Sequence, residues 1–327
     1  MRLLITGAGG LLGLNLSLEA LPLHTVIGVD RGTLVSPPFE LLQMDLTEAG
    51  AIERALRKSR ADAVVHCAAI ADVDACERNP DLAWRVNADV PVRIADACSK
   101  AGVGLVHIST DAVFDGMNHG QYRETCTAPS HPIGVYAETK RAGEGAVLSA
   151  YPEAIVARVN FYGWSVSGTR SLAEFFANHL SAGKPVRGFV DVVFCPMLVN
   201  DLANTLLKML SAGLQGLFHA VGPEAMTKYQ FGLEIARRFG LDAGLIAAES
   251  VEQAGLAARR GHNLNLSVHK LSTALGGTLP SFSTGLERFH TQYRQGYPQL
   301  IRSYQQASTS PAIDRRKGPS TVGQGPE

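Results

Sequence analysis

A glycine-rich turn near the N-terminus constrains the fold of this 327-residue chain more than any other feature. Residues 6–13 read TGAGGLLG and join a short apolar run to a helical pattern. Glycines at this spacing permit a tight turn, let the backbone approach a diphosphate and allow close packing of the helix on the strand. The start of the helix adds unpaired N–H groups and a positive dipole end. We expect a dinucleotide-binding unit; the alternative is an ordinary glycine-rich turn. The residues expected at the diphosphate are Gly7, Gly10, Leu11, Leu12 and Gly13.

Strand-like and helix-like segments alternate along the first half of the chain. The apolar runs are 2–6, 25–30, 39–45, 61–69, 104–109 and 154–160, and the helical patterns between them are 10–21, 48–59, 81–101 and 134–150. Continuous apolar strands are typical of a parallel sheet that helices cover on both faces. We therefore predict an α/β fold, a Rossmann-like doubly wound parallel sheet with a smaller C-terminal α/β substrate-binding lobe.

The regular alternation ends near residue 160. Turns and irregular stretches follow, although 217–222 reads as a strand and 228–240 as an amphipathic helix ended by glycine. We expect an NAD(P)-binding domain over 1–160 and a substrate-binding lobe over 161–302, which can share strands or helices with the first. Residues 303–327 have almost nothing to bury and are expected to be a disordered tail.

Charge and cysteine content argue against several functional classes. Thirty basic and thirty acidic residues cancel, so nothing indicates binding to nucleic acid or to an anionic membrane surface. No apolar run approaches the roughly 18 residues of a membrane span, and no signal peptide precedes the first strand. The five cysteines lack CxxC or metal-ligand spacing, so we expect reduced thiols, a cytoplasmic protein and no metal site.

Acidic residues end the second and third apolar runs. Asp30 stands where a carboxylate can bind the adenosine ribose, which favours NADH because a carboxylate repels the 2′-phosphate of NADPH. Arg31 could instead bind that phosphate, so the choice between NADPH and NADH stays open. Asp45 and Leu46 would lie near the adenine, unless Asp45 simply starts a turn.

Tyr136 and Lys140 lie four residues apart in the helical segment VYAETKRAGE and share one helix face. A free tyrosine has a pKa of about 10, and a nearby ammonium lowers it by stabilising the phenolate. The pair predicts Tyr136 as a general acid or base, with Lys140 also able to hold the nicotinamide ribose. An ordinary pair on a solvated helix face is the alternative.

Several motifs together resemble one protein family. TGAGGLLG, HCAAIADVDACE, RVNAD, ISTDAVFDG and YAETK stand in the order and spacing of the extended short-chain dehydrogenases/reductases. STDAVFDG followed by YRET, HP and YAETKRAGE is most similar to the dTDP-4-dehydrorhamnose reductase (RmlD-like) branch, and RRGHNLNLSVHKL loosely matches its C-terminal pattern. The resemblance implies an NAD(P)H-dependent reductase of a nucleotide-activated 4-keto-deoxysugar, as in dTDP-rhamnose biosynthesis.

The resemblance also implies roles for single residues. Thr110, Tyr136 and Lys140 would form the catalytic triad, in which Thr110 hydrogen-bonds the substrate carbonyl oxygen and Tyr136 supplies the proton. Ser109 is expected to cap the strand end. The remaining cofactor residues would be Ala68, Ala69, Ile70 and Asn87, the last supporting either the cofactor or the site backbone. The substrate-binding residues would be Asp111, Asn160 and Arg260.

The phosphates of such a substrate need cationic or N–H partners. The candidates are Arg158, Lys184, Arg187, Arg259 and Arg260, each of which could equally be a solvated surface residue. Departures from the branch lie on this substrate side, where RVNFYG stands for R-T-S-W-x-Y-G and DVVFCPM for D-Q-x-G-x-P-T. The sugar can therefore differ from 4-dehydrorhamnose.

The same residues bear on other functions that proteins of this fold carry out. Sugar-nucleotide 4,6-dehydratases carry Thr-Asp-Glu where this chain has Thr110-Asp111-Ala112, and alanine cannot take a proton, so dehydration is disfavoured. A 4-epimerase with tightly bound NAD stays open. So does a non-catalytic NADP-binding regulatory subunit, as in methionine adenosyltransferase beta, although the intact triad argues against it. The expected partner is a nucleotide sugar, and a homodimer stays open.

Overall fold

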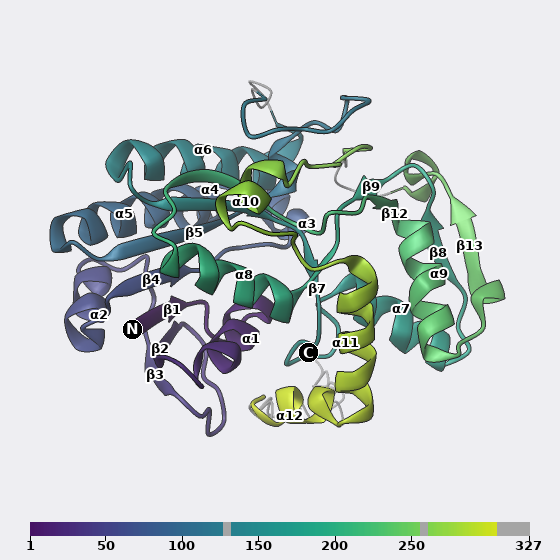
Figure 1. The fold of residues 1–327 in the computed structure, drawn as a ribbon, viewed down its shortest axis with the longest axis horizontal. Coiled ribbons are helices and arrows are strands. Elements are labelled where there is room, and N and C mark those ends of the chain that lie inside the picture. The colour runs from purple at the N-terminus through teal and green to yellow at the C-terminus, as the bar shows by residue number, and fades with distance from the viewer. Residues whose placement is uncertain (127–131, 256–260, 306–327) are drawn as a thin grey trace, which may run out of the picture.

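A parallel sheet of seven strands forms the centre of the computed structural model, which describes residues 1–126, 132–255 and 261–305 (Figure 1). The strand order is β11-β6-β5-β4-β1-β2-β3, and every neighbouring pair is parallel. This confirms the predicted doubly wound sheet. The strands are β1 (Arg2–Thr6), β2 (Thr25–Asp30), β3 (Glu40–Gln43), β4 (Ala63–His66), β5 (Gly104–Thr110), β6 (Ile155–Val159) and β11 (Gly216–Ala220).

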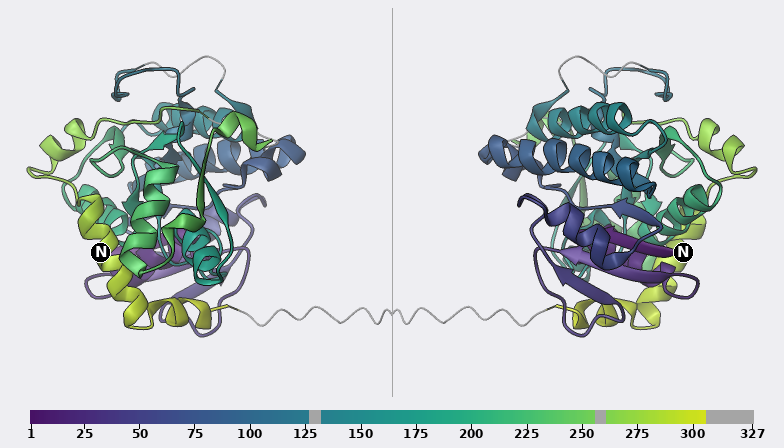
Figure 2. Two further views of the ribbon diagram at one scale, coloured as in Figure 1. Left: turned by 90° about the vertical axis from the view of Figure 1, so that its right-hand side faces the viewer. Right: turned by 90° about the vertical axis from the view of Figure 1, so that its left-hand side faces the viewer.

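Helices cover both faces of this sheet because successive strand residues point to opposite sides. Leu3 and Ile5 join one core cluster, and Leu4, between them, joins the other. The first cluster includes the helices α1 (Leu11–Ala20) and α8 (Val199–Ser211). The opposite face carries α2 (Ala51–Ser59), α5 (Val90–Ala101) and α6 (Gly134–Ala150), and α5 and α6 run side by side in the right-hand view of Figure 2.

The helical stretch predicted over 81–101 is divided by a π-helical turn. It comprises α4 (Pro80–Trp84), the π turn η1 (Arg85–Asp89) and α5, and α3 (Val73–Arg78) precedes it. Pro91 lies near the start of α5, has no N–H to donate to the carbonyl of Asn87, and its ring crowds that carbonyl. A π turn at this point accommodates the missing bond.

The chain beyond residue 160 builds a second group of elements and also returns to the sheet. Three two-stranded sheets pair β7 with β10, β9 with β12 and β8 with β13. Their strands are β7 (Phe161–Tyr162), β8 (Val186–Phe189), β9 (Val193–Phe194), β10 (Met197–Leu198), β12 (Met226–Thr227) and β13 (Ile246–Glu249). The helices are α7 (Leu172–Ser181), α9 (Lys228–Phe239), α10 (His269–Ala274), α11 (Phe282–Arg294) and α12 (Tyr297–Ser303).

No helix within these described ranges combines the length and the apolar character that a membrane crossing needs. Of the tail expected over 303–327, residues 306–327 lie outside the described residues. Tyr304 is buried, at the end of α12.

Candidate active site

The glycine turn after β1 has the close backbone contacts that only glycine permits. Gly7 has φ +66°, and a Cβ there would lie 2.8 Å from the backbone of Ala68. A Cβ on Gly13 would lie 2.0 Å from the carbonyl oxygen of Gly7. The first-turn N–H groups of α1, those of Leu11, Leu12 and Gly13, have no acceptor within the helix. This cradle fits a dinucleotide diphosphate, which those N–H groups would hold.

The Asp30 carboxylate joins the glycine turn to the loop after β2. The Gly9 N–H donates to its Oδ2 at 2.8 Å and the Gly32 N–H to its Oδ1 at 2.9 Å. A carboxylate accepts about four hydrogen bonds, so acceptor capacity remains for a ribose hydroxyl. Arg31 is exposed beside it.

Asp45 makes the hydrogen bonds of a turn. The N–H and the hydroxyl of Thr47 both donate to its Oδ1, at 2.9 and 2.7 Å. These bonds lower the pKa of Asp45, and the charges of Arg31 and Arg85 lower it further. Leu46 is buried in the core below. The contacts of Asp45 are thus those of a residue that starts a turn. Two arginines place positive charge near its carboxylate.

Asn87 holds the loop that follows β4. Its Oδ1 accepts the Ile70 N–H at 2.9 Å, and its Nδ2 donates to the Ile70 carbonyl at 3.0 Å and to Thr139 Oγ1 at 3.3 Å. The side chain is fully buried. Asn87 is expected to support either the cofactor or the site backbone, and its contacts are those of a residue that supports the backbone. Ala68, in the same loop, lies directly against Gly7.

Thr110 and Tyr136 meet at the carboxyl end of β5. The Thr110 hydroxyl donates to Asp111 Oδ1 at 3.2 Å and accepts the Ala112 N–H at 3.2 Å, and it lies close enough to the Tyr136 phenol to act on its pKa. Burial raises the pKa of Tyr136 to about 12, although the neighbouring Thr110 hydroxyl opposes the shift. The expected lowering of this pKa by Lys140 is not seen: besides burial, the charge of Asp111 raises it, and Lys140 is not among the groups that act on the phenol.

Lys140 lies under the site. Its side chain is 2% exposed, and Nζ donates to the carbonyl of Ile108 at 2.7 Å, two residues before Thr110. Burial lowers the pKa of Lys140 to about 8, although the Glu144 carboxylate raises it. The lysine thus anchors α6 to β5.

Asp111 and Asn160 form a hydrogen-bonded pair beside Thr110. Asn160 Nδ2 donates to Asp111 Oδ2 at 2.6 Å. Burial raises the pKa of Asp111, although hydrogen bonds from Asn160 and Thr110 and the charge of Lys228 lower it. No motif in the sequence points to Lys228, the first residue of α9. The capping residues around it mark a helix start, but only tertiary packing brings its charge near Asp111.

Arg158 is part of a buried network and not a surface cation. Its Nε and Nη2 donate to the two oxygens of Glu144 at 2.9 and 2.7 Å, and its guanidinium lies 4.7 Å from the centre of the Phe114 ring. Ser109 donates to the same carboxylate at 2.5 Å. The expectation that Arg158 binds a substrate phosphate is therefore corrected, since its charge is already paired. Ser109 binds a side chain and not the nearby backbone.

The other expected phosphate partners are dispersed. Arg187 pairs with Glu249 at 3.2 Å on the surface, and Lys184 is exposed. Arg259 and Arg260 lie outside the described residues. All five cysteines are free thiols, and burial raises the pKa of Cys67 to about 12, which leaves it unreactive at neutral pH.

Comparisons with known proteins point to one family. A dTDP-4-dehydrorhamnose reductase of Mycobacterium tuberculosis is 37% identical over 288 residues, covering 85% of this chain and 88% of the relative. The probable low-salt glycan biosynthesis reductase Agl14 of Haloferax volcanii is 34% identical over 293 residues, covering 88% and 96%. Methionine adenosyltransferase 2 subunit beta of Pongo abelii is 30% identical over 296 residues, covering 88% and 86%.

Solved structures agree with this assignment. That of a dTDP-4-dehydrorhamnose reductase from Bacillus anthracis in complex with NADP superposes with a TM-score of 0.80 at 26% identity, covering 89% of this chain and 99% of the other. The family model described as "RmlD substrate binding domain" matches residues 1–295. The chain therefore belongs to the RmlD substrate-binding-domain family, in the extended short-chain dehydrogenase/reductase fold.

Proposed function

We propose that this chain is an NAD(P)H-dependent reductase of a nucleotide-activated 4-keto-deoxysugar, similar to dTDP-4-dehydrorhamnose reductase. The observation that carries the proposal is the grouping of Thr110 and Tyr136 beside the hydrogen-bonded pair of Asp111 and Asn160. Thr110 ends β5, and Asp111 and Asn160 follow β5 and β6, at the same edge of the sheet as the glycine turn after β1. Ligands of doubly wound folds bind outside this edge.

The coenzyme half of the site would be built from the glycine turn, Asp30 and the loop of Ala68, Ala69 and Ile70. When bound, NADPH or NADH would supply the hydride that reduces the carbonyl carbon. The first-turn N–H groups of α1 would hold the diphosphate, and Asp30 the adenosine ribose. Asn87 would act through Ile70, because its side chain hydrogen-bonds both the N–H and the carbonyl of that residue.

Tyr136 would donate the proton that the reduced carbonyl oxygen takes up. A phenol with a pKa of about 12 carries its proton at neutral pH and is still a stronger acid than the alcohol that the reduced carbonyl becomes. Thr110 would hydrogen-bond the same oxygen and fix its position. Lys140, charged below a pH of about 8, would stabilise the developing phenolate and hold the nicotinamide ribose.

The substrate half would use Asp111 and Asn160 for sugar hydroxyls and Lys228 for the diphosphate. Lys228 stands near Asp111, and its charge acts on that carboxylate. Lys228 belongs to the substrate-binding lobe that we propose for 161–302, so this lobe would contribute a side chain to the site. Arg260 stays a second candidate for the phosphates.

The experiment is coenzyme oxidation, measured with NADH and with NADPH against a panel of nucleotide 4-keto-deoxysugars. Tyr136→Phe should lower kcat by about 10²- to 10³-fold because the proton donor is lost. The dissociation constant for the coenzyme should change less than about threefold. Tyr151→Phe, at the end of the same helix, is the control and should keep the wild-type rate.

The outcomes separate the open alternatives. A Tyr136→Phe variant with near-normal rate would contradict the assignment of the acid. Coenzyme absorbance retained through purification, with interconversion of sugar epimers, would indicate a 4-epimerase. NADPH binding without turnover of any sugar would indicate a regulatory subunit.

A further inference from the structure

The short C-terminal helix α12 packs against the first elements of the chain. Figure 1 shows it beside α1, and both views of Figure 2 place its yellow ribbon next to the purple N-terminal unit. Ile301, near its end, is fully buried in the same core cluster as Leu14 and Leu16 of α1. The helix therefore completes the side of the fold that carries the glycine turn.

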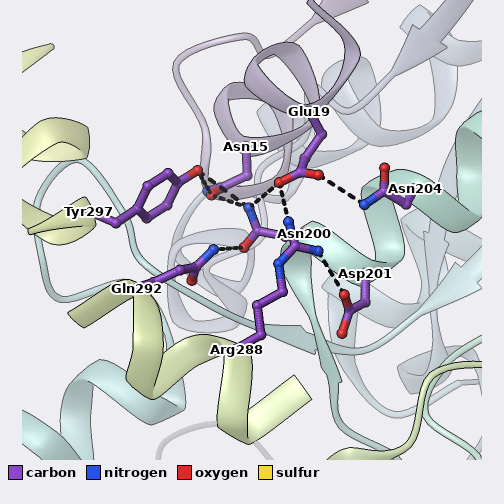
Figure 3. Close-up of polar contacts among 8 residues, drawn as sticks. All are labelled: Asn15, Glu19, Asn200, Asp201, Asn204, Arg288, Gln292 and Tyr297. Carbon is purple, nitrogen blue, oxygen red and sulfur yellow. Dashed lines mark hydrogen bonds and ion pairs between the residues drawn. The ribbon is translucent and has the colours of Figure 1, made fainter. Parts of the chain in front are cut away.

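The first residue of α12 is tied to α1 by side-chain hydrogen bonds. The Tyr297 hydroxyl donates to Asn15 Oδ1 at 2.9 Å and accepts from Asn200 Nδ2 at 3.3 Å (Figure 3). Asn15 Nδ2 in turn donates to the carbonyl of Leu11, the first residue of α1, at 2.8 Å. Tyr297 thus reaches the helix start that would hold the diphosphate, through one intervening side chain.

The other end of α12 is tied to the loop after β2. The Val35 N–H donates to the carbonyl of Tyr304, the residue that caps α12, at 2.9 Å. Leu34 packs against the core cluster that includes Ile301 and Tyr304. Its Cδ2 also lies close to Gly9, 3.6 Å from the position that a Cβ on this glycine would occupy. This loop begins at Asp30 and Arg31, the residues expected at the adenosine ribose.

The loop needs such an anchor because its own sequence does not form regular structure. The Asp30 carboxylate holds it at Gly32, and Ser36 has a positive φ of 43°, an unfavourable conformation for a residue other than glycine. A loop that is ordered before binding spares the ligand the entropy cost of ordering it.

We infer that α12 is a clamp on the coenzyme site, which holds the diphosphate helix and the adenosine-ribose loop in place and so sets coenzyme affinity. Tyr297 and Ile301 are its positioning residues, and neither is placed to touch the reacting atoms. The inference rests on the proposed function only in naming the ligand as NADH or NADPH. The mechanical link between α12 and the loop can be tested without any ligand.

The test uses the full chain and two matched pairs of variants. Ile301→Ala loosens the buried face of α12, and Leu300→Ala, at a side chain that is 46% exposed, is its control. Tyr297→Phe removes only the hydroxyl, and Tyr293→Phe, on the preceding helix, is its control. Calorimetry gives the dissociation constants for NADH and NADPH, and hydrogen exchange gives the protection of the amides of 31–36.

Ile301→Ala and Tyr297→Phe should each raise the coenzyme dissociation constant about fivefold or more, as expected for the loss of an anchoring contact. Amide exchange in 31–36 should rise in Ile301→Ala, and kcat at saturating coenzyme should stay within about twofold. The controls should match the wild type.

Unchanged affinity in both variants, or unchanged exchange of the loop in Ile301→Ala, would overturn the clamp. If Ile301→Ala fails to fold, Tyr297→Phe still decides through its affinity. If the wild type binds neither coenzyme, the proposed function fails, and the exchange comparison between Ile301→Ala and Leu300→Ala alone decides whether α12 holds the loop.

Discussion

Single residues at the carboxyl end of β5 owe their properties to burial. The four-residue spacing of Tyr136 and Lys140 predicts a shared helix face, and both lie on α6 below the strand end. The spacing says nothing about solvent, however, and desolvation moves the pKa of Tyr136 up and that of Lys140 down. The phosphate-binding role expected for Arg158 fails for the same reason, because its sequence neighbours do not reveal Glu144 as a buried partner.

Glu144→Gln tests the buried network. The change would leave the Arg158 guanidinium without its carboxylate in the core, and we expect a loss of about 3 kcal/mol in the free energy of unfolding. Glu153→Gln, at an exposed position nearby, is the control and should change stability by less than about 0.5 kcal/mol. Urea denaturation followed by circular dichroism measures both, and equal values for the two variants would contradict the role of the ion pair.

Lys228→Met tests substrate recognition. Loss of a cation that contacts a diphosphate should raise KM for the nucleotide sugar about tenfold and leave coenzyme affinity unchanged. Lys184→Met removes an exposed lysine of the same lobe and serves as the control. Steady-state kinetics decide, and a KM equal to that of the wild type would remove Lys228 from the site.

At the scale of elements, α6 and the π turn before α5 depend on a close contact. A Cβ on Gly143 would lie 2.6 Å from the carbonyl oxygen of Asn87, in the middle of that turn. The contact brings Asn87 near Thr139 and so connects α6 to the loop of Ile70. The length of the helical stretch could be predicted from its pattern. The π turn could not, because it depends on how Pro91 meets the preceding helix.

Gly143→Ala and Gly145→Ala form a matched pair on α6. The first places a methyl group against the backbone of the π turn and should lower the free energy of unfolding by about 1–3 kcal/mol. The second meets nothing within 4 Å and should raise it by about 0.5–1 kcal/mol, since alanine is the better helix former. Chemical denaturation measures both, and a Gly143→Ala variant as stable as Gly145→Ala would contradict the close contact.

Across the whole molecule, the sequence is most informative about the sheet and least informative about what joins distant segments. Continuous apolar runs predict β1 to β6, and the strand expected at 217–222 is β11, which lies at one edge of the sheet. The charge of Lys228 near Asp111 and the hydrogen bond between Val35 and Tyr304 bring together residues far apart in the chain, and no local pattern encodes them. Fold class follows from periodicity, whereas these contacts depend on packing.

The stability of the whole molecule should fall as the pH drops from 7.5 to 5.5. His66, His107 and His219 are buried, and burial lowers the pKa of each, to about 3 for His66 and His219. The unfolded chain takes up protons on these histidines below a pH of about 6.5 while the folded chain does not, so the stabilisation present above that pH is lost.

The expected loss is about 1 kcal/mol for each histidine at pH 5.5. Buried Asp111 and Asp201, whose pKa values are raised, act in the opposite direction as their own pKa is approached. Urea denaturation across this range measures the balance. A free energy of unfolding that stays flat or rises would show that the histidines do not dominate.

The two hydrogen bonds of Asp30 bear on any attempt to re-engineer coenzyme preference. Its carboxylate accepts the amides of both Gly9 and Gly32, so the side chain that would discriminate between the two nicotinamide nucleotides also fastens the turn in which they would sit. Replacing it to admit a phosphorylated ribose would therefore relax the cradle itself. A designer would have to install a substitute acceptor for those amides in the same step as the new phosphate contact.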